Sequence, residues 1–325
     1  MTHQNSTLTA EQTQWFQSTF AQLVDNVELA VLGKKRVVQL ALTCLVAEGH
    51  LLLEDFPGTG KTSLARAIAQ TLDGKQNRVQ FTPDLLPSDV TGVTIFDQKT
   101  QTFEFHPGPI FANIVLADEI NRASPKTQSA LLEVMEENQV TVDGVTHRVG
   151  QPFMVIATQN PIEQAGTYKL PEAQLDRFLM KSSIGYPDHA SSMQILSNSR
   201  KSSVVDPIIG TDHVGTMIDL AAQVHVEESV LDYVSRLIEA TREAPEILLG
   251  CSVRAGLGLV RAAKTWAVAA GRNYVLPDDV KALAVPVLAH RMVLDPEEEF
   301  GGNTTEKVLT RIIGQLAAPQ EAHSA

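Results

Sequence analysis

Residues 50–62 have the sequence HLLLEDFPGTGKT, an apolar run that stops at a Pro-Gly-x-Gly turn and ends in Lys61-Thr62. The following residues, Ser63 to Leu72, have the apolar pattern of a helix. A strand, a glycine-rich turn and a helix N-terminus form a cradle for phosphate, because backbone N–H groups and the helix dipole both favour an anion. The pattern predicts that the chain binds a nucleoside triphosphate through Gly58, Thr59, Gly60, Lys61, Thr62 and Ser63.

Side-chain chemistry predicts the roles within this cradle. We expect Lys61 to reach the β- and γ-phosphates and the Thr62 hydroxyl to hold Mg²⁺. The strict pattern G-x-x-x-x-G-K-[ST] requires glycine at position 55, where this chain has Asp55. An acid at that position must point away from the phosphates. The alternative interpretation is an ordinary glycine-rich turn between a strand and a helix.

Length and composition describe an acidic globular chain with room for two domains. Of its 325 residues 43% are hydrophobic and 20% charged, and the formal net charge is −12. That charge disfavours nucleic acid as a partner, because such proteins present a basic surface. Cys44 and Cys251 lie far apart, which predicts buried thiols in a reducing compartment. Without a signal pattern or an apolar run approaching about 18 residues, we expect a cytoplasmic protein with no membrane insertion.

Apolar strands alternate with helices as far as residue 186, and helices alone follow. This alternation predicts a parallel sheet covered by helices on both faces, with its ligand at the carboxyl ends of the strands. The strands are expected at residues 51–54, 78–81, 114–117, 153–158 and 180–184.

Two segments of alternating residues predict hairpins that project from this core. The first covers 93–105 with its tip at 97–100, and the second covers 140–149 around the turn Asp143-Gly144. We expect residues 1–10 to be a disordered lead, 11–186 to be a nucleotide-binding α/β core and 187–325 to be a helical domain. The acidic run 297–299 is expected to be a solvated loop.

Polar residues follow the third and fourth strands. Hydrolysis of a phosphoanhydride requires Mg²⁺ on the phosphates and a group that orients or deprotonates water. Asp118 could hold the metal through its water shell, and Glu119 could be the general base. Asn160 could orient phosphate and water without adding charge. The alternatives are solvated polar caps for the two acids and simple turn chemistry for Asn160-Pro161.

Several segments closely resemble the MoxR family of AAA+ ATPases, and the resemblance runs from about residue 31 to the end of the helical domain. The segments are DEINRA (118–123), ATQNP (157–161), GTYKLPEAQLDRF (166–178) and FTPDLLPSD (81–89).

The resemblance implies an AAA+ P-loop fold: a three-layer α/β core with strand order 5-1-4-3-2 and a small all-helical lid. The hairpin at 93–105 corresponds to the helix-2 insert, which faces a central pore, and the hairpin at Asp143-Gly144 corresponds to the pre-sensor-1 insert. Surface hairpins without contacts to a client remain the alternative. Asp55 agrees with the resemblance, because members of the family also carry an acid at that position.

The resemblance also implies functions for single residues. Asn160 corresponds to sensor 1, and Arg177 corresponds to an arginine finger that acts on a neighbouring subunit. The alternative for Arg177 is a structural ion pair with Asp176 or Glu172. Arg122 could support the subunit interface.

Two further correspondences concern the nucleotide. Arg254 corresponds to sensor 2, a lid arginine that reaches the γ-phosphate. The family usually has proline before this arginine, where this chain has Val253, so the preset φ of proline is absent at this helix start. Val31 and Gly33 correspond to the residues that line the adenine pocket.

The resemblance implies an ATP-hydrolysing, chaperone-like remodelling protein that uses ATP and Mg²⁺. ATP would be bound at the subunit interfaces of a homo-oligomeric ring, expected to be a hexamer, and hydrolysis would serve the maturation of client protein complexes. The resemblance also implies a partner with a von Willebrand factor A domain, which would be a separate protein.

Three other classes of function stay open. A nucleic-acid-associated AAA+ motor is disfavoured by the charge and by a hairpin tip whose one basic residue is Lys99. A P-loop kinase would need an acceptor pocket in place of Asn160, Arg177 and Arg254. A nucleotide-gated scaffold with slow hydrolysis differs from the leading hypothesis in kinetics alone.

Overall fold

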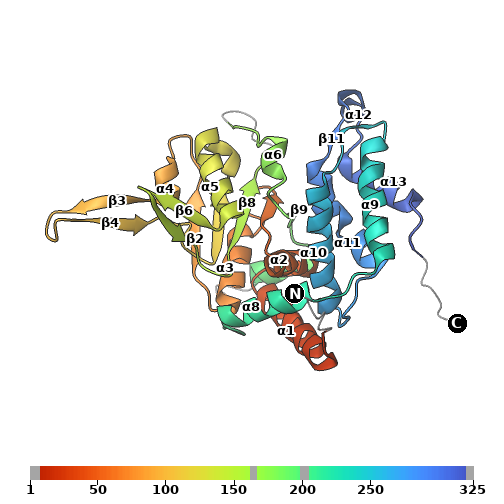
Figure 1. Cartoon of the computed structure of the whole chain (residues 1–325), viewed down its shortest axis with the longest axis horizontal. Coiled ribbons are helices and arrows are strands. Elements are labelled where there is room, and N and C mark those ends of the chain that lie inside the picture. The colour runs from red at the N-terminus through yellow and green to blue at the C-terminus, as the bar shows by residue number, and fades with distance from the viewer. Residues whose placement is uncertain (1–7, 162–166, 198–204, 320–325) are drawn as a thin grey trace, which may run out of the picture. The chain divides into compact units, whose positions relative to one another are not determined.

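The computed structural model describes residues 8–161, 167–197 and 205–319, which fall into two compact units (Figure 1). The first unit comprises Gln22–Phe178 and Ser182–Gly215. The second comprises Leu179–Lys181, Thr216–Ala325 and the N-terminal residues up to Ala21, as far as they are described. The boundary expected at residues 186/187 stays a prediction.

A sheet with the strand order β2–β5–β8–β1–β9 lies at the centre of the α/β core. The pairs β1/β8, β2/β5 and β5/β8 are parallel. Numbered along the chain, the order is the predicted 5-1-4-3-2, which is confirmed. The strands are β1 (Leu51–Glu54), β2 (Gln76–Gln80), β5 (Ile114–Asp118), β8 (Met154–Gln159) and β9 (Met180–Ser182).

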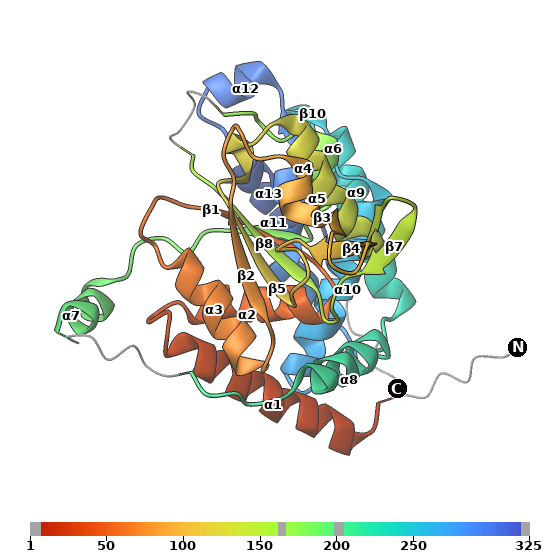
Figure 2. The ribbon, with the colours of Figure 1, turned by 90° about the vertical axis from the view of Figure 1, so that its left-hand side faces the viewer.

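Helices cover both faces of this sheet, as Figure 2 shows for α3 and α5. Every residue of β5 is buried, which agrees with the uninterrupted apolar run at residues 114–117. Leu131 and Met135 of α5 belong to the core on one face, and Leu64 and Ile68 of α3 are fully buried. The helices of this core are α2 (Lys35–Val46), α3 (Lys61–Thr71), α4 (Pro87–Thr91), α5 (Pro125–Glu137), α6 (Glu172–Leu175) and α7 (His189–Ser197), with the 3₁₀ helix η1 (Ile120–Arg122).

Both predicted hairpins are present, and they contact each other. β3 (Gly92–Asp97) pairs with β4 (Thr102–Pro107) and projects from the core (Figure 1), and β6 (Gln139–Val142) pairs with β7 (Val145–Arg148). The turn Asp143-Gly144 has the two positive φ angles, 49° and 79°, that its sequence predicts. The ring of Phe105 stacks on the ring of His147 with a centroid distance of 3.9 Å, so the bases of the two hairpins are joined.

The second unit is mainly helical. Tyr233, Leu259 and Leu283 are among its fully buried side chains, and Arg272 makes a two-point ion pair with Asp279 at 2.6 Å. A small sheet of β10 (Ile247–Leu249) and β11 (Val293–Leu294) adds to the helices. The helices of this unit are α9 (Glu228–Glu243), α10 (Val253–Ala269), α11 (Pro277–Leu288), α12 (Pro296–Phe300), α13 (Thr305–Gln315) and the 3₁₀ helix η2 (Ala289–Arg291). Two more helices, α1 (Ala10–Glu28) and α8 (Thr211–Ala222), have residues in both units.

The acidic run 297–299 forms a helix, so the expected loop is wrong. The Asp295 side chain accepts a hydrogen bond from the Glu297 N–H, and Pro296 occupies the first helical position. Glutamates in a first turn are favoured by the helix dipole, so the charges stabilise this short helix although it is exposed.

Three further expectations concern the chain ends, the thiols and the membrane. Residues 1–7 of the expected lead lie outside the described residues, while Leu8 is buried and α1 begins at Ala10. Cys44 and Cys251 are buried free thiols, as expected. No helix in the described part of the chain is long and apolar enough to cross a membrane.

Candidate nucleotide site

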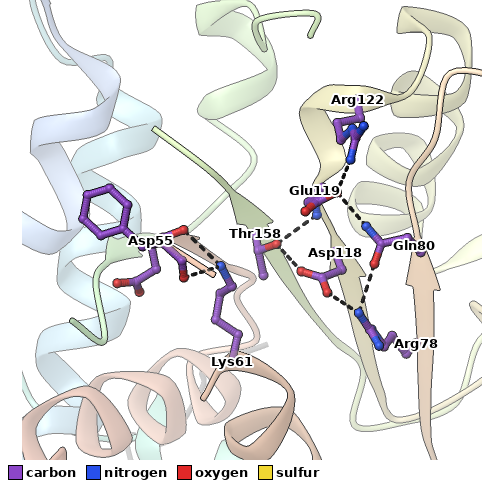
Figure 3. Close-up of polar contacts among 9 residues, drawn as sticks. Asp55, Lys61, Arg78, Gln80, Asp118, Glu119, Arg122 and Thr158 are labelled. Atoms are coloured by element: carbon purple, nitrogen blue, oxygen red, sulfur yellow. Dashed lines mark hydrogen bonds and ion pairs between the residues drawn. The ribbon is translucent and has the colours of Figure 1, made fainter. Parts of the chain in front are cut away.

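The loop between β1 and α3 has the backbone of a phosphate cradle. Gly58 and Gly60 have φ angles of +83° and +97°, which residues with a side chain rarely adopt. Lys61 begins α3, and its Nζ donates hydrogen bonds to the carbonyl oxygens of Asp55 at 3.0 Å and Phe56 at 3.2 Å (Figure 3). The lysine side chain therefore lies across the loop, and Thr62 and Ser63 follow it in the first turn of the helix.

The contacts of Asp55 explain why an acid can replace the glycine of the strict phosphate-loop pattern. Its residue is 2% exposed, and its carboxylate accepts hydrogen bonds from the Ser183 hydroxyl and from the backbone N–H groups of Ile184 and Gly185. The acid turns toward residues 183–185, as its position in the loop predicts. It thereby fixes the start of the loop to the segment that follows β9.

The segment with Val31 and Gly33 lies beside the same loop. The Cγ1 atom of Val31 is 4.0 Å from the point where a Cβ on Gly60 would lie. Gly33 has a φ of +70°, and a Cβ there would lie 2.5 Å from the Ser191 hydroxyl. The backbone N–H of Ser191 donates to Asp188 and lowers the pKa of that carboxyl. The structure therefore brings Val31 to the cradle, whereas Gly33 lies against Ser191 and Asp188.

Asp118 and Glu119 stand at the carboxyl end of β5 and are joined through Thr158 of β8. The Thr158 hydroxyl donates to Oδ1 of Asp118 at 2.6 Å and accepts from the backbone N–H of Glu119 at 2.9 Å (Figure 3). Glu119 has a φ of 56° and a ψ of 49°, a left-handed conformation that is uncommon for residues with a side chain. The neighbouring strand thus fixes where both carboxylates lie.

Arg78 and Gln80 of β2 complete a network that the sequence analysis did not identify. Arg78 Nη2 contacts Asp118 Oδ2 at 2.7 Å and donates to the Gln80 carbonyl oxygen Oε1 at 3.0 Å. The Gln80 amide Nε2 donates to Glu119 Oε2 at 2.8 Å, and Arg122 Nη1 contacts the same oxygen at 2.9 Å. The sequence does contain a signal for this network. The polar residues Arg78 and Gln80 flank the buried Val79, and residues two apart share one face of a strand.

The donor set at this edge of the sheet fits Mg²⁺. Thr62 supplies a hydroxyl oxygen and Asp118 a carboxylate, which are the oxygen donors that this ion prefers. The carboxylate of Asp118 already has a cationic partner in Arg78, which shows that the position attracts positive charge. Each carboxylate oxygen has two lone pairs, so Asp118 can also accept from metal-bound water.

Asn160 comes directly after β8 and is partly buried. The Asp55 N–H donates to the Gln159 carbonyl oxygen at 3.1 Å, so Asn160 begins beside the cradle. The carboxyl ends of β1, β5 and β8 therefore bring the cradle, the two acids and Asn160 to one edge of the sheet.

Arg177 makes an ion pair, but with a residue that the sequence did not suggest. Its Nη2 lies 3.2 Å from Oε2 of Glu136, near the C-terminal end of α5. The Gln174 amide also reaches the Ser129 hydroxyl of α5 at 3.5 Å. Helix α5 thus holds the segment that carries Arg177, and both side chains of the ion pair keep about a third of their exposure, 30% and 36%.

Helix α5 also contacts two of the sequence motifs, DEINRA (118–123) and GTYKLPEAQLDRF (166–178). The Gln128 amide donates to the carbonyl oxygens of Ile120 and Tyr168, and the Tyr168 N–H donates to the Asn121 carbonyl oxygen. The segment after Glu119 and the segment before α6 are therefore fixed to each other. Gly166 of the second motif lies outside the described residues.

Arg254 is the second residue of α10 in the other unit, and it is exposed. The Ser252 side chain caps this helix by accepting from the Ala255 N–H at 3.2 Å. The cap fixes the helix start where Val253 replaces the proline that is usual in the resembling family. The role of Arg254 as sensor 2 stays a prediction.

Comparison with protein families gives two matches. Residues 50–180 match the model described as the ATPase family associated with various cellular activities (AAA), and residues 239–312 match the AAA lid domain. The chain is 47% identical to the uncharacterized protein YeaC of Bacillus subtilis (91% of this chain, 93% of that protein). It is 39% identical to the chaperone MoxR1 of Mycobacterium tuberculosis (93% and 83%) and 30% identical to the protein MoxR of Methylorubrum extorquens (85% and 88%).

A solved structure has the same fold. The crystal structure of a protein from Cytophaga hutchinsonii is 39% identical to this chain, with a TM-score of 0.89. The match covers 95% of this chain and 98% of that one.

Proposed function

The chain belongs to the MoxR family of AAA+ ATPases, and from this we propose that it hydrolyses ATP at the site around Lys61, Asp118 and Glu119. One observation carries the proposal. The Thr158 hydroxyl bridges the Asp118 carboxylate and the Glu119 N–H, so the two acids are held in fixed relation at the strand edge that also bears the cradle. Hydrolysis needs one acid that holds the metal ion and a second that accepts a proton from the attacking water.

The residues of the cradle would bind and orient the nucleotide. Lys61 would exchange the carbonyl oxygens of Asp55 and Phe56 for the β- and γ-phosphates, and Val31 and Gly33 would line the base pocket. Thr62 and Asp118 would hold Mg²⁺, which neutralises charge on the phosphates when bound.

The remaining residues would act on water and on the developing charge. Glu119 would accept the proton of the attacking water, and Asn160 would orient that water. Arg177 would act on the ATP of a neighbouring copy, and Arg254 would contact the γ-phosphate from the lid. A finger in trans implies a ring, expected to be a hexamer, with ATP at the subunit interfaces.

The biological role that we infer is chaperone-like remodelling of protein complexes in the cytoplasm. In support, the β3–β4 hairpin exposes large apolar side chains, with Phe96 at 48% and Phe103 at 74% exposure. The two rings contact each other with a centroid distance of 5.2 Å, and contiguous exposed apolar surface marks sites that contact other proteins. A client, or a separate protein with a von Willebrand factor A domain, would meet this hairpin.

One observation favours slow basal hydrolysis, which is the scaffold-like alternative. Oε2 of Glu119 accepts from both Gln80 and Arg122, so the two lone pairs of this oxygen are already engaged and do not face water. In that case the nucleotide gates binding of the client, and the client accelerates turnover.

The cradle is tested by phosphate release and by binding of a fluorescent ATP analogue. Lys61→Ala should lose both. Lys75→Ala is the matched control, since it removes an exposed lysine just before β2 and should behave as the parent. Nucleotide binding and hydrolysis that survive in Lys61→Ala would contradict the proposal.

A further inference from the structure

The ion pair between Arg177 and Glu136 is a weak source of stability. Nη2 of Arg177 and Oε2 of Glu136 are 3.2 Å apart, and the two side chains are 30% and 36% exposed. Ion pairs at this exposure are screened by water and salt and contribute little to the free energy of folding. The effect of this contact is therefore chiefly on where the guanidinium lies.

The carboxylate of Glu136 is carried by a rigid part of helix α5. Met135, the residue before it, is 5% exposed, and its carbonyl oxygen lies 2.9 Å from Nε2 of the buried His50. Nδ1 of His50 accepts the Val155 N–H at 3.0 Å, so Nε2 carries the ring proton and donates to Met135. The backbone that carries Glu136 is thus fixed to the central sheet.

The backbone of Arg177 is fixed as well, whereas its side chain is long. Phe178 is fully buried in the same core as Leu131 of α5, and the Arg177 N–H donates to the Gln174 carbonyl oxygen at 3.2 Å. An unrestrained arginine side chain has many rotamers, and ordering them costs entropy when the guanidinium binds a phosphate. An acceptor that selects one rotamer in advance removes part of this cost.

The contact leaves the guanidinium able to bind an anion. Nη2 contacts the carboxylate of Glu136, and the same planar group carries further N–H donors on Nε and Nη1. One guanidinium can therefore contact a carboxylate and a phosphate at the same time, so Glu136 does not have to be released before Arg177 acts.

We propose that Glu136 is a positioning residue for Arg177. It holds the guanidinium in the rotamer that reaches the ATP of a neighbouring copy, and it keeps this contact during hydrolysis. The inference rests on the proposed function, because it uses Arg177 as a finger that acts in trans.

The first test combines steady-state phosphate release with thermal unfolding. Glu136→Ala should lower kcat on the order of tenfold, because a finger that is not held in place is productively oriented for only part of the time. KM for ATP should stay within about threefold, because the finger acts on charge that develops in the transition state. The melting temperature should fall by less than about 3 °C, as expected for an exposed ion pair.

Glu137→Ala is the matched control, because it removes an exposed glutamate from the same end of α5 and should behave as the parent. A kcat of Glu136→Ala at or above the parent value would overturn the proposal. So would a large loss of thermal stability, which would give Glu136 a structural role instead.

Mixing experiments separate positioning of the finger from a general defect. Glu136→Ala subunits have an intact base and lack a well-placed finger, so they should gain activity when mixed with Glu119→Gln subunits, whose finger is intact. Mixing them with Arg177→Ala subunits should give no gain, because both partners lack a working finger. Native mass spectrometry checks that each variant assembles and exchanges subunits. The reverse pattern, or failure of Glu136→Ala to assemble, would contradict a positioning role.

The levels of inference fail separately. If Lys61→Ala retains nucleotide binding and hydrolysis, the proposed function itself is wrong. If Arg177→Ala hydrolyses ATP at the parent rate, the assignment of the finger is wrong. If both variants are inactive while Glu136→Ala keeps the parent kcat, the site and the finger stand and the role of Glu136 alone is refuted.

Discussion

The hydroxyl of Thr158 donates to Oδ1 of Asp118 at 2.6 Å, and the same hydroxyl accepts the backbone N–H of Glu119. One buried side chain on β8 therefore positions both acids at the end of β5. Thr158 is fully buried, so neither partner can exchange it for bulk water. The arrangement of the site depends on this contact between neighbouring strands.

Thr158→Val should damage both stability and turnover, because it keeps the shape of threonine and removes the hydroxyl. Leaving a buried N–H and a carboxylate oxygen without this partner should cost about 1–3 kcal/mol of unfolding free energy. Phosphate release should fall tenfold or more. Denaturant unfolding and steady-state kinetics measure the two effects, and Thr158→Ser should retain most of both. A fully active Thr158→Val would contradict the positioning role.

Asp55→Gly should destabilise the chain, although it restores the glycine of the strict phosphate-loop pattern. The carboxylate of Asp55 accepts from one hydroxyl and two backbone N–H groups, and the variant leaves these donors buried without an acceptor. We expect a loss of about 3 kcal/mol or more, measured by denaturant unfolding. A variant as stable as the parent would show that the contact with residues 183–185 is dispensable.

The arginine finger can be tested by mixing two inactive proteins. Arg177→Ala lacks the finger and Glu119→Gln lacks the base, so neither should hydrolyse ATP alone. In mixed assemblies some interfaces combine an intact base with an intact finger, so a fraction of the parent activity should return. An inactive mixture, although native mass spectrometry shows that the subunits exchange, would place Arg177 in a structural role with Glu136.

The β3–β4 hairpin should be required for client contact and not for hydrolysis. A double variant, Phe96→Ser with Phe103→Ser, removes an exposed aromatic pair whose ring centroids lie 5.2 Å apart. We expect an unchanged melting temperature and basal rate, and a large loss of co-purified proteins when the pair is changed in a Glu119→Gln background. Val145→Ser, at an exposed position on the other hairpin, is the matched control. Equal recovery of the same proteins would assign client contact elsewhere.

Local signals in the sequence account for much of the fold. Ser124-Pro125 has the residue types of a helix start, an N-cap serine and a proline at the first helical position, and the Ser124 side chain caps α5 by accepting from the Thr127 N–H. The turn Asp143-Gly144 predicted its hairpin, because only certain residues adopt two positive φ angles in succession. Such signals lie within a few residues of one another, so they can be recognised without the structure.

Contacts between distant segments could not be predicted in the same way. Arg78 meets Asp118, and Arg177 meets Glu136, only after strands and helices from separate segments have packed together. For Arg177 the sequence suggested neighbours in the chain, Asp176 or Glu172, whereas helix packing supplied a more distant acid. The acidic run 297–299 shows a different error, because its charge was considered without the capping residue Asp295.

Glu119 is the proposed base of the ATP-hydrolysing site. Its role is tested most directly by the rate of phosphate release from Glu119→Gln at saturating ATP and Mg²⁺, with binding of a fluorescent ATP analogue measured on the same preparation. The amide of glutamine is close in size to the carboxylate but cannot accept a proton from water. We predict binding within a few-fold of the parent and a rate at least 100-fold lower. Hydrolysis at the parent rate would contradict the assignment.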